Sequence, residues 1–296
     1  MIRRTFQLTS GVGPWREKDL WARGVLSWDQ LPQEGGEPAI SRAQDAALRV
    51  QIALARSALE AKDLPALAAL FPPREHWRLY PEFRDEALYF DIECDGGGAP
   101  APTVVTVLDA EGIHAFIQGR NLDGLPERLG RRRLWVSFNG TVYDVPMLKA
   151  YFGRALPAPA VHLDLRFFFR KLGKGMGLKA LEDDLGLSRP PHLATLNGLG
   201  AVDLWRQYRA TGDLGPLRVL VEYNAYDAIN LRGVLDRGYN RAVERLSFDG
   251  ERVPEFERGD VLYDLSRLLL ALEPTGEDAR TARRLLPQDR QLLDGE

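Results

Sequence analysis

The stretch Ala87-Leu88-Tyr89-Phe90-Asp91-Ile92-Glu93 decides how the rest of this sequence is interpreted. Its apolar first half has the length of a buried strand, and two carboxylates follow. Side chains alternate between the faces of a strand, so Asp91 and Glu93 point to the same side, about 7 Å apart. Like charges at the end of an apolar strand are costly unless a cation compensates them. Their oxygens suit Mg²⁺ or Mn²⁺, although a strand end that simply reaches solvent also explains the pair.

Composition limits the class of protein. The chain has 296 residues and 45% apolar content, which is enough for a large core. No apolar run reaches the roughly 20 residues that span a bilayer, the N-terminus lacks a signal-like segment, and Cys94 is the single cysteine. We therefore expect a cytoplasmic protein. The net charge of -3 gives no general attraction to nucleic acid, so any such binding requires a local basic surface or bound metal.

Three regions are predicted along the chain. Residues 1–84 have helical patterns and no strand alternation, and they form an appended helical module. Within it, a helix ending near Gly24 and a second helix capped by Ser27 suggest a helix-hairpin-helix element with a Gly-Val-Gly turn, or simply a turn packed on the neighbouring domain. Residues 85–245 form the main α/β domain. Residues 246–296 form a C-terminal tail, with a helix expected over 262–272.

The main domain is predicted to contain a mixed sheet. Strands over 87–93, 103–108 and 113–118 follow one another with short turns, which indicates three antiparallel neighbours. Short buried strands over 134–138 and 161–164 alternate with helices, as in open α/β sheets. Ligands bind such sheets outside the carboxyl ends of their strands.

Two later segments carry candidate polar groups. Asn139 and Asp144 follow the strand over 134–138, where Asp144 is either a site residue or only a helix cap. The loop over 171–179 alternates lysine and glycine, so Lys174 and Lys179 are candidate phosphate contacts, although the spacing is not that of a Walker motif.

The last candidate pair lies on a long predicted helix over 214–237. Tyr223 and Asp227 are four residues apart and share one helix face. An inward-facing Asp in this apolar segment needs a partner. The alternative is that Asp227 faces water while Tyr223 packs in the core.

In this order, the motifs resemble those of a known superfamily. Asp91-x-Glu93, Asp144 behind Phe138-Asn139-Gly140, and Tyr223-x-x-x-Asp227 are similar to the three exonuclease motifs of the DnaQ-like DEDD superfamily, and the tyrosine is typical of its DEDDy type. Residues 73–235 resemble its bacterial YprB-type branch through His76-Trp77-Arg78-Leu79, Asp91-Ile92-Glu93, Ser137-Phe138-Asn139-Gly140, His162-Leu163-Asp164-Leu165 and Leu178-Lys179-Ala180-Leu181-Glu182. That branch commonly has His where Tyr223 stands.

The resemblance implies a ribonuclease-H-like mixed sheet flanked by helices. It also implies a 3′-5′ exonuclease that hydrolyses DNA or RNA with two divalent cations, Mg or Mn. The expected catalytic residues are Asp91, Glu93, Asp144, Tyr223 and Asp227. The four carboxylates would be the metal ligands, and Tyr223 would orient the attacking water.

The expected partner is nucleic acid with a single-stranded 3′ end, without a membrane, and Asn139, Lys174 and Lys179 are the expected substrate contacts. Two alternatives remain open. A structure-specific endonuclease on the same fold would carry the same motifs. A catalytically weak nucleic-acid-binding protein would not need four carboxylates.

Overall fold

A five-stranded sheet forms the centre of the computed structural model, which describes residues 1–33, 40–246, 250–256, 267–269 and 272. The strand order is β3-β2-β1-β4-β5. β1, β2 and β3 are antiparallel neighbours, whereas β1, β4 and β5 run parallel, which confirms the predicted mixed sheet. The strands are Ala87–Cys94 (β1), Pro102–Asp109 (β2), Gly112–Ile117 (β3), Leu134–Ser137 (β4) and Val161–Asp164 (β5).

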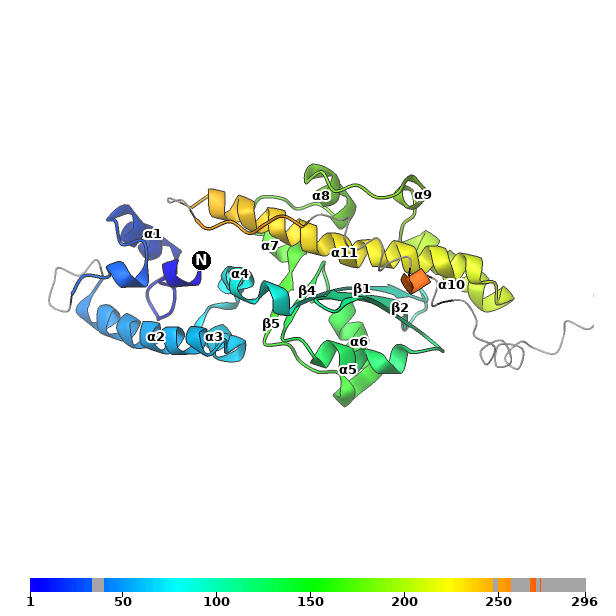
Figure 1. Ribbon diagram of the computed structural model, residues 1–296, viewed down its shortest axis with the longest axis horizontal. Coiled ribbons are helices and arrows are strands. Elements are labelled where there is room, and N and C mark those ends of the chain that lie inside the picture. The colour runs from blue at the N-terminus through cyan, green and yellow to red at the C-terminus, as the bar shows by residue number, and fades with distance from the viewer. Residues whose placement is uncertain (34–39, 247–249, 257–266, 270–271, 273–296) are drawn as a thin grey trace, which may run out of the picture.

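Helices cover both faces of the sheet (Figure 1). The long helix α11 (Leu214–Glu244) crosses one face, and α5 (Leu125–Gly130) and α6 (Asp144–Phe152) cover the other. β2 is buried along its whole length. This two-sided cover explains why the strands have continuous apolar runs.

The remaining helices of the main domain lie between β5 and α11 in the sequence. They are α7 (Leu165–Lys171), α8 (Leu178–Asp184), the short α9 (Pro191–Ala194) and α10 (Gly198–Thr211). Asp213 caps α11 by accepting a hydrogen bond from the backbone of Gly215. The helix ends about two turns beyond the predicted Arg237, because buried residues continue to Val243.

The N-terminal region is helical, as predicted. Its α-helices are α1 (Pro14–Ala22), α2 (Arg42–Glu60), α3 (Leu64–Leu70) and α4 (Tyr80–Phe83). A buried ion pair ties α1 to the segment before the sheet, since both terminal nitrogens of Arg78 donate to Glu17 at 2.9 and 2.7 Å. One hydrophobic cluster continues from Met1 through the sheet to Val243. The division near residue 84 stays a prediction.

The second helix expected after Ser27 is wrong. Trp28–Gln30 forms only a three-residue 3-10 turn, and Ser27 makes no side-chain cap. Leu31 follows this turn, and Pro32 disfavours helical backbone at Leu31 because of the steric clash of its ring with the preceding residue. The segment thus lacks the pair of α-helices that a helix-hairpin-helix element requires.

Two further findings concern the rest of the chain. Most of the helix expected over 262–272 falls on residues outside the described ones. Within the described residues, no helix combines the length and the apolar character needed to cross a membrane.

Candidate active site

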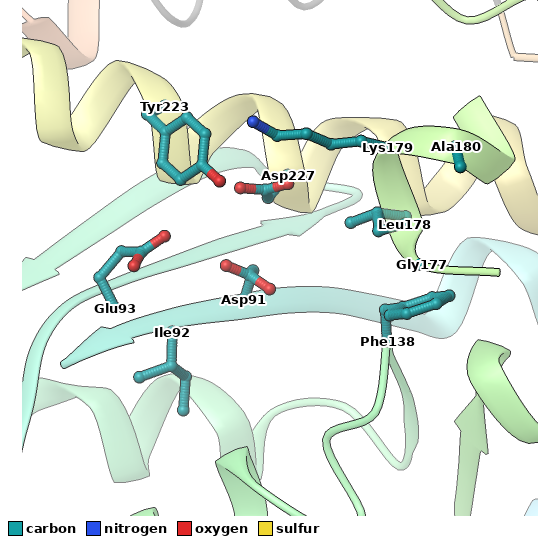
Figure 2. Close-up of a pocket in the computed structure, with 10 residues that line it drawn as sticks. All are labelled: Asp91, Ile92, Glu93, Phe138, Gly177, Leu178, Lys179, Ala180, Tyr223 and Asp227. Atoms are coloured by element: carbon teal, nitrogen blue, oxygen red, sulfur yellow. The ribbon is translucent and has the colours of Figure 1, made fainter. Parts of the chain in front are cut away.

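The alternation of β1 decides which way its carboxylates face. Leu88 and Phe90 pack with the α5 and α6 side of the sheet, whereas Ala87 and Tyr89 belong to the larger core on the α11 side. Asp91 and Glu93 continue the second set because side chains repeat every two residues. Both carboxylates therefore point toward α11, as Figure 2 shows.

Helix α11 supplies the third carboxylate. Asp227 lies opposite β1, and ligand oxygens of Asp91, Glu93 and Asp227 come within 4.8 Å of one another. Tyr223 lies one turn earlier on the same helix face, with its hydroxyl directed toward these carboxylates (Figure 2). Tyr223 and Asp227 are both buried, so the interpretation in which Asp227 faces water is wrong.

Asp144, the first residue of α6, lies close enough to this cluster for its charge to act on Asp91 and Glu93. It is buried, but it is not one of the three residues whose ligand atoms fall within 4.8 Å. The loop before it turns sharply at Asn139, which has a φ of 65°. Gly140 then allows a close approach, since a Cβ there would lie 2.8 Å from Oδ2 of Asp144.

Asp164 at the end of β5 fixes the loop that carries Asp144. Its carboxylate accepts backbone hydrogen bonds from Asn139 at 2.8 Å, Thr141 at 3.0 Å and Arg166 at 3.1 Å. The first two bonds hold the loop against the neighbouring strand β5, and the third caps α7. Asp164 is thus a helix cap and an anchor of the loop, and it is not one of the three clustered carboxylates.

Asp144 and Asp227 are buried and Asp91 and Glu93 are half-buried at the cleft, which changes the acidity of all four. Burial raises the pKa of Glu93 to about 8, and the charges of Asp227 and Asp144 act in the same direction. Burial likewise raises the pKa of Asp91 well above its usual range, reinforced by Asp227, Asp144 and Glu93. Burial also raises the pKa of Asp144 to about 7. The influence of Asp144 on Asp91 and Glu93 indicates that all four carboxylates form one electrostatic unit.

This donor set fits a divalent cation. Three carboxylates converge and a fourth stands nearby, and oxygen donors of this kind suit Mg²⁺ or Mn²⁺. A cation would also remove the repulsion that raises the pKa values of these groups.

Asn224 was missed by the sequence analysis. Its side-chain nitrogen donates to Oδ2 of Asp91 at 2.8 Å, and the residue is fully buried. Its side-chain oxygen has no hydrogen-bond partner among the described residues. The i, i+3 spacing of Asn224 and Asp227 on one helix face is the signal that could have identified it.

A cleft of about 530 Å³ opens onto the cluster. It is lined by Asp91, Ile92, Glu93, Phe138, Gly177, Leu178, Lys179, Ala180, Tyr223 and Asp227. Lys179 thus lines the cleft, where its ammonium nitrogen donates to the backbone carbonyl of Leu196 and lies 5.1 Å from the ring centroid of Tyr223.

The other two expected substrate contacts are engaged elsewhere. Lys174 forms an ion pair with Asp184 at 2.7 Å, and the side-chain oxygen of Asn139 accepts a hydrogen bond from Arg166 at 2.8 Å. Neither Lys174 nor Asn139 lines the cleft, and their contact with substrate stays a prediction.

Family comparison agrees with this architecture. A family model described as the RNase_H superfamily matches residues 88–239, just over half of the chain. The matched region includes the four carboxylates, Tyr223 and all five strands except Ala87, the first residue of β1. The chain therefore belongs to the RNase_H superfamily.

Two solved structures share a limited likeness with the chain. One is the family B DNA polymerase from the hyperthermophilic archaeon Pyrobaculum calidifontis, with 16% identity, a TM-score of 0.40, and coverage of 54% of this chain and 24% of the polymerase chain. The other is the Nibbler EXO domain of Aedes aegypti, with 16% identity, a TM-score of 0.40, and coverage of 66% of this chain and 91% of that domain. The match spans only about a quarter of the polymerase. No curated protein matches the sequence.

Proposed function

We propose that this chain is a metal-dependent nuclease that hydrolyses phosphodiester bonds from the 3′ end of DNA or RNA. The observation that carries this proposal is the convergence of Asp91, Glu93 and Asp227 to within 4.8 Å at the floor of a cleft. Membership of the RNase_H superfamily supports it, as do the position of Tyr223 beside the cluster and the effect of the Asp144 charge on Asp91 and Glu93.

The four carboxylates Asp91, Glu93, Asp144 and Asp227 would hold two divalent cations, Mg or Mn. When bound, such ions activate the attacking water and stabilise the leaving oxygen of the phosphodiester. The charges of Asp227, Asp144 and Glu93 all raise the pKa of Asp91, so this carboxylate has all three of the others near it. It is therefore the best candidate to serve both ions.

Tyr223 would orient the attacking water through its hydroxyl. Burial raises the pKa of Tyr223 far above its usual range, and the charges of Asp227, Glu93 and Asp91 add to this effect. The phenol is thus neutral at pH 7 and keeps its proton for hydrogen bonding. Its side chain positions the water without acting as a strong base.

The partner proposed for this cleft is a nucleic acid with a single-stranded 3′ end. Lys179 lines the cleft and would contact a backbone phosphate, and Asn139 and Lys174 remain candidates for further contacts. We take the chain to be a DEDDy-type enzyme of the cytoplasm. The free thiol of Cys94 is consistent with a reducing compartment of this kind.

The first experiment tests metal-dependent hydrolysis. End-labelled single- and double-stranded DNA and RNA are incubated with Mg²⁺ or Mn²⁺ and with wild type or Asp91→Ala. We expect activity only with metal, and Asp91→Ala should be inactive but at least as stable, because removal of one carboxylate relieves repulsion. The exposed Asp85, just before β1, provides the control Asp85→Ala, which should remain active. Activity of Asp91→Ala, or of wild type in excess chelator, would contradict the assignment.

A second experiment tests the polarity of degradation. A 5′-labelled strand should give a descending ladder of products, and a blocked 3′ hydroxyl should slow the reaction. Efficient cutting of a circular strand would instead support the endonuclease alternative. Tight binding without hydrolysis would support a nucleic-acid-binding protein.

A further inference from the structure

Arg189 brings a positive charge into the acidic cluster from the connection between α8 and α9. Its side chain is only 5% exposed. Nε and one terminal nitrogen donate to the carboxylate of Glu182 at 2.7 and 2.6 Å, and the same terminal nitrogen also donates to Oδ1 of Asp227. The guanidinium therefore joins a buried carboxylate on α8 to the proposed metal ligand on α11.

Glu182 anchors this arrangement. It is 1% exposed on α8, and it also accepts a hydrogen bond from the side chain of Asn230 on α11 at 3.0 Å. It is not part of the acidic cluster that could hold a metal ion. Glu182 is consequently placed to hold Arg189 rather than to bind the cation itself.

We infer that Arg189 is a positioning residue, which fixes the carboxylate of Asp227 so that one oxygen remains directed toward Asp91 and Glu93. The last torsion of an aspartate side chain is broad, and repulsion from two neighbouring carboxylates would turn Asp227 away from them. A guanidinium held by Glu182 opposes this rotation. Asp227 then keeps the orientation that a divalent cation requires.

The hydrogen bonding of Arg189 indicates that this residue does more than stabilise the fold. Its other terminal nitrogen, Nη1, is buried and has no hydrogen-bond partner among the described residues. A buried donor without a partner destabilises the fold. The guanidinium is thus placed where it reaches both carboxylates, at the expense of its own hydrogen bonds.

The substitution Arg189→Lys isolates this role. It keeps one positive charge, but an ammonium lacks the planar fork that contacts both carboxylates at once. Loss of a group that orients a metal ligand typically lowers metal affinity about 10- to 100-fold. We expect Arg189→Lys to bind Mn²⁺ more weakly by this factor, and kcat for an oligonucleotide to fall while its KM changes little.

A second buried pair in the same chain offers a matched control. Arg84 contacts both carboxylate oxygens of Asp236 at 3.1 and 2.7 Å. These residues lie outside the cleft and the acidic cluster. Arg84→Lys should lower thermal stability to a similar degree and leave Mn²⁺ affinity unchanged.

The test is a titration of the full chain with Mn²⁺, followed by calorimetry or electron paramagnetic resonance, with circular dichroism to verify folding. Glu182→Gln removes the anchor and should also weaken Mn²⁺ binding. The double variant that combines Arg189→Lys with Glu182→Gln should bind Mn²⁺ no more weakly than the weaker-binding single variant, because the two residues act as a unit. If Arg189→Lys fails to fold, Glu182→Gln alone decides the question.

The outcomes separate this inference from the proposed function on which it rests. Wild-type affinity in folded Arg189→Lys or Glu182→Gln, or an equal loss in Arg84→Lys, would overturn the positioning role and leave the nuclease assignment standing. Failure of wild type to bind Mn²⁺ at all would overturn both.

Discussion

Tyr223 is the residue at which packing and chemistry are hardest to separate. It is only 6% exposed, as a core aromatic would be, yet its hydroxyl faces three carboxylates (Figure 2). Lys179 and Arg189 approach its ring, with their charged groups 5.1 and 5.6 Å from the ring centroid. Cations over the ring hold its plane in place. The hydroxyl is therefore the part of Tyr223 left to act on a water molecule.

Removal of this hydroxyl should affect only the chemical step. We expect Tyr223→Phe to keep its stability and Mn²⁺ affinity, since the ring still packs, while the single-turnover rate falls about 10²- to 10⁴-fold. Tyr239→Phe, four turns along α11, loses a hydroxyl bonded to the backbone of Glu251 and should retain the wild-type rate. A Tyr223→Phe rate within about two-fold of wild type would remove Tyr223 from the catalytic residues and leave the carboxylates in place.

At the scale of elements, the loop between β4 and α6 determines where Asp144 lies. Asp164 on β5 fixes this loop through two backbone hydrogen bonds, from Asn139 and Thr141, and Gly140 lets Ser137 and Asp144 approach the backbone closely. Each contact comes from a different element. The position of Asp144 thus depends on the pairing of β4 with β5, not on α6 alone.

A methyl group at Gly140 should disturb this arrangement. In Gly140→Ala the new Cβ would clash with the side chain of Ser137 and lie 2.8 Å from Oδ2 of Asp144. Such overpacking costs about 1–3 kcal/mol of unfolding free energy. Displacement of Asp144 should also lower kcat about 10²-fold. Gly198→Ala is the control, because a Cβ there meets nothing within 4 Å. Full activity of Gly140→Ala, measured with wild type on the same oligonucleotide, would show that Asp144 is not held by this contact.

At the scale of the whole molecule, the active-site carboxylates make stability depend on pH and metal. In the metal-free protein burial raises the pKa of Glu93 from 4.5 to about 8 and that of Asp144 from 3.8 to about 7. At pH values between the unfolded-state pKa and the folded-state pKa of each group, the folded state then binds more protons than the unfolded state. The resulting stability is fully present below about pH 4 and is lost as the pH rises through the folded-state values.

We therefore expect the melting temperature in chelator to fall between pH 5.5 and pH 8.5. Mg²⁺ should restore more stability at pH 8.5 than at pH 5.5, because cation binding requires ionised carboxylates. Differential scanning calorimetry with and without Mg²⁺ measures both effects, and Glu93→Gln should show a smaller fall. If the melting temperature of metal-free wild type rose between pH 5.5 and pH 8.5 relative to that of Glu93→Gln, the raised pKa values would be contradicted.

Much of the fold and part of the site follow from local patterns in the sequence. Period-two alternation in β1 puts Asp91 and Glu93 on one face, and helical spacing puts Tyr223 and Asp227 on one face of α11. Both patterns depend only on residues that are close in the chain. The short turns between the first three strands likewise predict antiparallel neighbours, which the structure confirms.

Only the tertiary structure decides which faces meet. The bond from Asn224 to Asp91 joins residues 133 positions apart, and Arg189 reaches Asp227 from 38 positions away. No local period encodes such pairs, because they depend on how α11 packs against β1 and how the connection after α8 lies against α11. Local patterns therefore account for the acidic residues of β1 and α11 and for the face on which each lies. Packing across the sheet brings those faces together and places the Arg189 guanidinium and the Asn224 amide against the carboxylates, because such contacts join residues far apart in the chain.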